Sequence, residues 1–252
     1  MKVVRVERRT AGEASALLVH GNDLCAEFYL PLAEVLAGLG VDMSLVTLPG
    51  FHDQAPYDEP TWARFARDIA AEVRKLAGPP VLIGHSMGGF MAFLAAVELA
   101  EDLERLVLIE PAIYPRKFMA RAASRAYLDR VVLGDRGEFD NSTGVVPRIH
   151  DLAGYPKDKI ELYLDVRRAS HMPTMTALFE QLPELYPLPF GSLSAPTLLL
   201  SGARVGIRGR LLAGMVRRRF KQVTHHFIDR AAHWVVNEQD AAVAGYIAEF
   251  VA

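Results

Sequence analysis

Short apolar runs alternate with amphipathic stretches over the first 110 residues, and the same alternation resumes after residue 195. Apolar runs of this kind, bounded by turn residues, are typical of strands. Several of them are apolar on both faces, which is the pattern of a buried strand in a parallel sheet. The runs predicted as strands are 3–6, 14–20, 41–48, 81–83, 103–109, 196–201 and 224–228.

Helical periodicity fills the intervals between these runs. The clearest case is 61–76, where Trp62, Phe65 and Ile69 lie on one stripe and Thr61 is placed to cap the first turn. The other predicted helices of this part are 24–39, 87–100, 208–220 and 239–251. Strands that alternate with helices predict an α/β fold with a mostly parallel central sheet flanked by helices on both faces.

The pattern changes between residues 112 and 194, where helical segments but no strand are predicted. We interpret this segment as a helical cap inserted after the strand that ends at Glu110, above a core made of 1–111 and 195–252. The cap is rich in arginine, which is either solvated helix surface or a source of positive charge in the cleft that would favour an anionic substrate. The predicted cap helices are 116–133, 157–168 and 172–182, and the arginines are Arg116, Arg121, Arg125, Arg130, Arg136, Arg148, Arg167 and Arg168.

Composition narrows the class of protein. The chain has 252 residues, 51% of them hydrophobic, and a formal charge of −2, so it offers no electrostatic reason to bind nucleic acid or an anionic membrane. We find no membrane span and no signal peptide, and we expect a cytoplasmic monomer or homodimer that acts on a small molecule. Cys25 is the only cysteine and is interpreted as a packing residue. We find neither a cofactor fingerprint nor metal-ligand spacing, and expect no cofactor and no metal.

One motif carries chemistry. The apolar run at 81–83 leads into Gly84-His85-Ser86-Met87-Gly88, and a small-residue helical stretch follows at once. Strand, tight turn and helix are the context of a nucleophile elbow, in which the serine hydroxyl stands clear of the sheet. The amide of Met87 would then lie at a helix N-terminus, where it can donate to a developing oxyanion. The alternative is an ordinary glycine-rich turn.

The chain resembles the α/β-hydrolase family, in its capped serine esterase and lipase-like branch. The resemblance is carried by the elbow at 84–88, by His20-Gly21 after the second strand, and by Ala232-His233-Trp234 near the end. It implies Ser86 as nucleophile, His233 as general base and then acid, and the amides of Asn22 and Met87 as the oxyanion hole. His20 would brace the oxyanion loop. The residues expected to border the substrate pocket are His20, Gly21, His85 and Trp234.

The third member of the triad departs from the family pattern. Many relatives place the acid after the next-to-last strand, in a Gly-x-x-Asp sequence. Here that stretch runs from Gly202 to Val205, so the expected aspartate is missing. Glu110, at the end of the strand after the elbow helix, is the substitute we favour. The alternative is a structural role, in which Glu110 caps the start of the inserted helical segment or binds one of its arginines. Asp229 is the fallback.

The resemblance implies acyl transfer on a small ester or thioester. Two alternatives remain open at this stage. One is hydrolysis of a carbon–carbon bond next to a carbonyl with the same triad. The other is a non-catalytic small-molecule-binding protein on this fold, which the missing acid at Val205 would favour.

Overall fold

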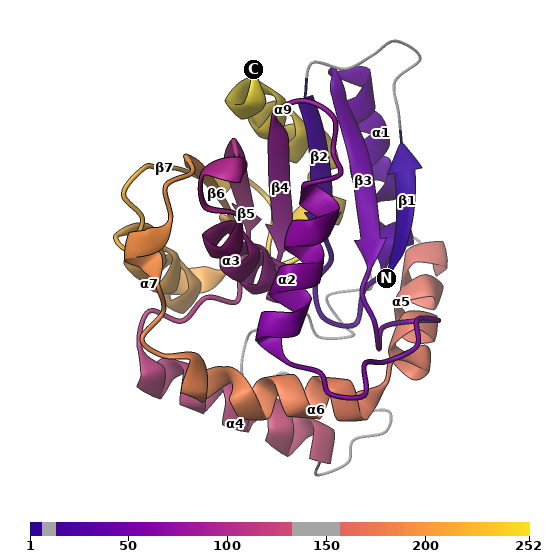
Figure 1. Ribbon diagram of the computed structural model, residues 1–252, viewed down its shortest axis with the longest axis vertical. Helices are drawn as coiled ribbons and strands as arrows, with labels where there is room; N and C mark the ends of the chain where they lie inside the picture. The colour runs from indigo at the N-terminus through magenta and orange to yellow at the C-terminus, as the bar shows by residue number, and fades with distance from the viewer. Residues whose placement is uncertain (7–13, 133–156) are drawn as a thin grey trace.

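A seven-stranded sheet forms the centre of the computed structural model, which describes residues 1–6, 14–132 and 157–252 (Figure 1). The strand order is β1-β3-β2-β4-β5-β6-β7; β1 runs antiparallel to β3, and all other neighbours are parallel. The predicted fold class is therefore confirmed. The strands are β1 (Lys2–Val6), β2 (Ala14–Val19), β3 (Val41–Thr47), β4 (Pro80–His85), β5 (Arg105–Ile109), β6 (Thr197–Gly202) and β7 (Val223–Ile228).

Helices cover both faces of the sheet because the inner strands are apolar on both. In β4, Leu82 faces the side covered by α2 (Trp62–Val73), α3 (Met87–Leu99) and α7 (Gly206–Arg217). Its neighbour Ile83 faces the opposite side, where α1 (Leu30–Gly38), α8 (Val235–Glu238) and α9 (Asp240–Val251) pack. The predicted cap on α2 is present, since the Thr61 hydroxyl accepts a hydrogen bond from the Arg64 amide at 3.2 Å.

The structure differs from the predicted helices in two places. The stretch 24–39 begins later, as a 3-10 turn over Ala26–Tyr29 followed by α1. Pro31, in the first turn of α1, has no N–H to continue a hydrogen-bond ladder backward, so the α-helix starts there. The second difference is α8, a single turn of helix in what the sequence predicted as loop.

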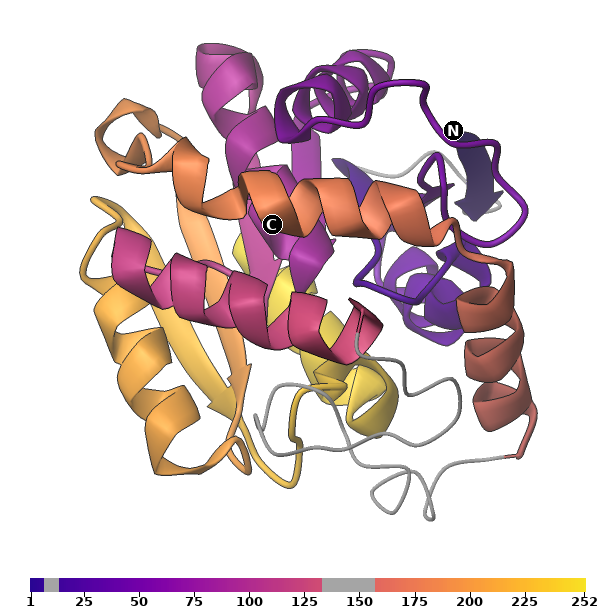
Figure 2. The same cartoon turned by 90° about the horizontal axis from the view of Figure 1, so that it is seen from below.

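The three predicted cap helices lie across the carboxyl ends of the strands. They are α4 (Lys117–Val132), α5 (Lys157–Ala169) and α6 (Met172–Gln181), and the view from below shows α4 and α6 side by side (Figure 2). The hydroxyl of Ser124 donates to the Phe179 carbonyl at 2.7 Å, which joins α4 to α6. Arg136 and Arg148, two of the arginines predicted in the cap, lie outside the described residues.

The cap is packed into the core rather than set apart from it. Met175 and Leu178 of α6 are fully buried in the same hydrophobic cluster as the side chains of α2 and α3. The indole N–H of Trp62, on α2, donates to the Leu178 carbonyl at 2.6 Å. Within the described part of the chain, no helix has the length and apolar character needed to cross a membrane.

Candidate active site

The turn between β4 and α3 presents Ser86 at the carboxyl edge of the sheet. Ser86 has φ 53° and ψ −118°, a backbone conformation that residues other than glycine rarely adopt. The glycine positions on either side of it leave no room for a larger side chain. A Cβ on Gly84 would lie 2.5 Å from the Gly88 carbonyl oxygen, and one on Gly88 would lie 2.2 Å from the His20 carbonyl oxygen. Both glycines are therefore required by close backbone contact, as the elbow interpretation expects.

His233 reaches Ser86 from the loop between β7 and α8. Its Nε2 lies 2.9 Å from the Ser86 Oγ, within hydrogen-bond distance. The loop is tied to the end of β6, because the Arg204 amide donates to the Ala231 carbonyl at 2.8 Å. The Glu238 carboxylate accepts a hydrogen bond from the Ala232 amide on the other side. The structure thus brings together two residues that are 147 positions apart in the chain.

Glu110 lies on the far side of the same imidazole. Its Oε2 is 3.6 Å from His233 Nδ1, which is ion-pair distance and longer than a direct hydrogen bond. Its Oε1 accepts the Gly202 amide at 2.7 Å, so the carboxylate is held in place. Glu110 has φ 44°, a second strained backbone position at this edge. Val205 begins the turn into α7, and Asp229 is exposed; the acid that faces the imidazole is Glu110.

His85 is buried beneath the site and bonded at both ring nitrogens. Its Nε2 lies 2.9 Å from the His233 carbonyl oxygen and its Nδ1 lies 2.7 Å from the Tyr29 hydroxyl. That hydroxyl accepts the Gly21 amide at 2.9 Å. Burial lowers the pKa of His85 to about 3, so the ring is neutral. The sequence suggested His85 as a pocket residue and gave no signal for Tyr29, which sits in an apolar turn.

His20 braces the loop that follows β2, which we predict from the sequence to be the oxyanion loop. His20 Nε2 accepts the Leu48 amide at 3.0 Å, so Nδ1 carries the proton and donates to the Gly21 carbonyl at 2.7 Å. Because C=O and N–H point in opposite directions across a trans peptide, this bond also fixes where the Asn22 N–H points. Burial lowers the pKa of His20 to about 4, which keeps the ring neutral. With no exposed surface, His20 lies behind the loop.

Asn22 and Asp23 carry the contact between this loop and the cap. Arg167 of α5 lies 3.2 Å from an Asp23 carboxylate oxygen. The Asn22 amide group donates to Asp23 at 3.0 Å and to the Tyr127 hydroxyl of α4 at 3.4 Å. Among the described cap arginines, Arg167 is therefore committed to a core carboxylate. The exposed ones are Arg116, Arg121, Arg125 and Arg168; Arg130 lies on α4 with its side chain outside the description.

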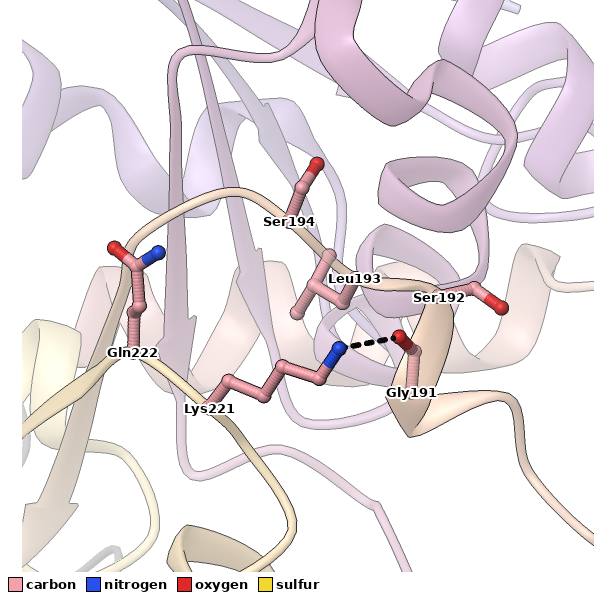
Figure 3. Close-up of a pocket in the computed structure, with 6 residues that line it drawn as sticks. All are labelled: Gly191, Ser192, Leu193, Ser194, Lys221 and Gln222. Atoms are coloured by element: carbon pink, nitrogen blue, oxygen red, sulfur yellow. Dashed lines mark hydrogen bonds between the residues drawn. The ribbon is translucent and has the colours of Figure 1, made fainter.

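Trp234, the last predicted pocket residue, is buried between core and cap. Its ring meets Phe28 at a centroid distance of 5.4 Å and Tyr163 of α5 at 5.1 Å. A hollow does exist elsewhere, before β6 and β7, where Lys221 donates to the Gly191 carbonyl at 3.1 Å (Figure 3). That position is at the amino ends of the strands, opposite the elbow. The expected pocket between elbow and cap stays a prediction, because part of the cap is outside the described residues.

One group of possible metal ligands occurs among the described residues, formed by Cys25, Glu27 and His52. Their ligand atoms lie within 4.8 Å of one another. Burial raises the pKa of the Cys25 thiol to about 12, and the Lys2 ammonium already binds Glu27 at 2.7 Å. A protonated thiol and a competing cation both oppose metal binding. Cys25 is buried, as its interpretation as a packing residue expects.

Comparisons with solved structures bear on the fold. The MenH structure from S. aureus aligns with TM-score 0.82 and 17% identity over 99% of this chain and 97% of that one. A thermophilic esterase from Thermogutta terrifontis aligns with TM-score 0.78 and 23% identity over 99% and 92%. An enol-lactonase from Burkholderia xenovorans LB400 aligns with TM-score 0.72 and 17% identity over 99% and 95%. At these identities the likeness shows a shared fold.

Sequence comparison gives the family. No curated protein matches the chain. A sequence model of a protein family, described as the alpha/beta hydrolase family, matches residues 16–246, which include Ser86, Glu110 and His233. The chain therefore belongs to the alpha/beta hydrolase family and is a hydrolase.

Proposed function

We propose that this protein is a serine hydrolase that cleaves a small ester or thioester through an acyl-enzyme formed on Ser86. The observation that carries the proposal is the 2.9 Å approach of His233 Nε2 to the Ser86 Oγ, at a turn whose strained backbone lifts the hydroxyl above the sheet. A serine hydroxyl is a weak nucleophile until a neighbouring base accepts its proton.

The reaction proceeds in two stages. In the first, Ser86 attacks the carbonyl carbon while His233 Nε2 takes the hydroxyl proton, and then passes that proton to the departing alcohol or thiol. In the second, His233 takes a proton from water, which attacks the acyl carbon. The bond from that carbon to the Ser86 Oγ then breaks, His233 returns the proton to the Ser86 oxygen, and the acid is released. The amides of Met87 and Asn22 hold the oxyanion in both stages; losing one such donor costs roughly 3–4 kcal/mol of barrier.

Glu110 completes the triad in this proposal. Its carboxylate faces His233 Nδ1 at 3.6 Å, which favours the tautomer with the proton on Nδ1 and leaves Nε2 free to accept. Catalytic hydrogen bonds are often longer before substrate binds and shorten in the reacting complex. The bond from the Gly202 amide holds the other carboxylate oxygen, so a short movement of the imidazole closes the gap.

A small substrate without strong negative charge fits the surroundings best. Arg167, the cap arginine at the oxyanion loop, is neutralised by Asp23. Two of the similar structures are described as an esterase and an enol-lactonase, both of which open esters. The paired arginine and these neighbours support a neutral ester or thioester.

A fluorophosphonate probe tests the proposal, because it reacts covalently with an activated serine. We expect intact-mass analysis to show one adduct on the wild type and none on Ser86→Ala. Ser192→Ala is the matched control: this serine is exposed near the amino end of β6 and should leave labelling unchanged (Figure 3). A wild type without an adduct contradicts the proposal and favours the binding-protein alternative.

A panel of substrates separates the two enzymatic alternatives. The nucleophile and base are the same for an ester and for a carbon–carbon bond next to a carbonyl, so the triad does not distinguish them. We expect turnover of p-nitrophenyl acetate and of short acyl thioesters. Turnover confined to carbon–carbon substrates, with normal fluorophosphonate labelling, would replace the ester assignment and leave the nucleophile in place.

A further inference from the structure

A directional chain of hydrogen bonds runs beneath the site from the oxyanion loop to the histidine loop. The Gly21 amide donates to the Tyr29 hydroxyl at 2.9 Å. The hydroxyl lies 2.7 Å from His85 Nδ1, and His85 Nε2 lies 2.9 Å from the His233 carbonyl oxygen. Tyr29 and His85 are each 1% exposed, so water does not compete for these bonds.

The direction of each bond follows from the acceptors. A carbonyl oxygen only accepts, so His85 Nε2 carries the proton and donates to His233. The neutral ring then has a bare Nδ1, which accepts the one proton of the Tyr29 hydroxyl. The hydroxyl oxygen in turn accepts from Gly21. Each group uses its donor and acceptor once, and no alternative partner is needed.

These hydrogen bonds contact the backbone beside each proposed catalytic group. Gly21 precedes the proposed oxyanion donor Asn22, His85 precedes the nucleophile Ser86, and the far end is the main chain of His233 itself. The packing is close, since a Cβ on Gly21 would lie 3.1 Å from His85 Nδ1 and 3.2 Å from the Ser86 Cβ. A change in either bond of His85 therefore moves one loop relative to the elbow.

We propose that Tyr29 and His85 are positioning residues that set the oxyanion loop and the His233 loop at fixed places relative to Ser86. The inference rests on the proposed function for its kinetic consequence and on the hydrogen bonds alone for its structural one. Misplacing a reacting group by about 1 Å can cost about 10²-fold in rate. The two residues thus act on kcat while binding of the substrate is left to other surfaces.

The first variant is Tyr29→Phe, which removes the hydroxyl and keeps the ring against Phe28 and His85. We expect the rate of fluorophosphonate labelling and the kcat for p-nitrophenyl acetate to fall about 10- to 100-fold, with KM changed less than about 3-fold. Tyr186→Phe is the matched control. It also deletes one hydroxyl bonded to the main chain, the 2.6 Å bond to the Tyr114 carbonyl, and should leave the kcat unchanged.

A second series of variants tests the two hydrogen bonds of His85 separately. A glutamine places its amide near the Nε2 position and can still donate to His233, whereas an asparagine ends near the Nδ1 position and can accept only from Tyr29. We expect His85→Gln to retain more kcat than His85→Asn, and His85→Leu to retain the least. Wild-type labelling rates in Tyr29→Phe and His85→Leu, or equal losses in all three His85 variants, would overturn the inference.

A readout without turnover separates this inference from the hydrolase proposal. We expect the backbone amide resonances of Gly21 in Tyr29→Phe and of Trp234 in His85→Leu to shift in ¹⁵N NMR spectra, since each reports on a broken bond. If the wild type is not labelled but these resonances shift, the hydrolase proposal fails and the positioning inference stands. If they do not shift, the positioning inference is wrong whatever the labelling shows.

Discussion

The core and the cap of this protein hold their polar groups in different ways. In the core, Ser86 and Glu110 each follow a strand directly, and each has a strained backbone bonded to the neighbouring strand or its loop. In the cap, α5 and α6 meet the core through contacts in which a side chain takes part, as in the 3.2 Å pair of Arg167 with Asp23 and the bond from the Trp62 indole to the Leu178 carbonyl. Core groups are therefore placed by the sheet, and cap groups by the docking of helices.

This difference separates two kinds of function. A residue at a strand end has a backbone that is hydrogen-bonded to the neighbouring strand. This suits a reaction that needs its atoms at fixed positions. A side chain on a docked helix keeps rotamer freedom, which suits selection among substrates. We therefore expect substitutions at core strand ends to change the rate of the chemical step, and substitutions in the cap to act mainly on KM or on stability.

The largest effect is expected for Glu110→Gln, which keeps the shape of the side chain and removes its charge. The neutral amide no longer favours the Nδ1–H tautomer, and we expect kcat for p-nitrophenyl acetate to fall about 10³-fold, ~4 kcal/mol of barrier. Asp229→Asn is the matched control, at an exposed acid on the loop that carries His233. Unchanged kcat in Glu110→Gln, or an equal loss in Asp229→Asn, would move the third triad position elsewhere.

Much of the core site could be predicted because it depends on strand ends. Parallel pairing of β5 with β6 puts the end of β5 next to Gly202, so Glu110 was a reasonable substitute for the acid missing at Val205. The elbow was predictable because Gly84 and Gly88 meet backbone atoms at contact distance, a requirement that leaves a sequence signature. The 3.6 Å separation from His233 depends on loop packing and leaves no such signature.

An effect of intermediate size is expected when the pH is lowered. The free energy of unfolding should fall because of the buried histidines of the core. Burial lowers the pKa of His20 to about 4 and of His85 to about 3, from 6.5. Below pH 6.5 the unfolded chain binds protons that these native rings do not, so stability falls as the pH drops from 6.5 toward 4. Between pH 7 and pH 5.5 we expect a loss of about 1 kcal/mol for each ring.

Urea unfolding at several pH values measures this loss. In His85→Gln, only the ring of His20 still contributes, so the dependence should be shallower by about half. A free energy of unfolding that stays constant from pH 7 to pH 5.5 would mean that these rings take up protons in the native core as readily as in the unfolded chain. That would contradict the hydrogen bonds that His20 accepts from Leu48 and His85 from Tyr29.

Contacts between core and cap were harder to predict. Asp23 and Arg167 are 144 positions apart, and the spacing of cap arginines gave no reason to prefer one of them. The same holds inside the core for Tyr29, whose partner His85 is 56 positions away on β4. Such pairs arise only when separate elements pack together, so periodicity predicts the elements and not which of their polar side chains meet.

The smallest effect is expected for Arg167→Gln, which removes the charge at the contact between α5 and the oxyanion loop. The Arg167 side chain is 34% exposed, so solvent screens the pair, and we expect a loss of at most about 1 kcal/mol of unfolding free energy. Asp23 then loses its cation, and kcat for a neutral ester should fall less than about 5-fold. Arg168→Gln, at an exposed neighbour paired with Asp165, is the control and should change neither quantity.

Arg167→Gln also tests whether the cap takes part in the chemical step. If Arg167→Gln lowers kcat for a neutral ester as far as Glu110→Gln does, the cap pair helps to place the oxyanion loop and belongs with the core machinery. If it raises KM only for a carboxylate-bearing ester, Arg167 exchanges Asp23 for the substrate, and the cap arginine serves an anionic ligand after all. A small and uniform change across both esters is the result that keeps chemistry in the core and docking in the cap.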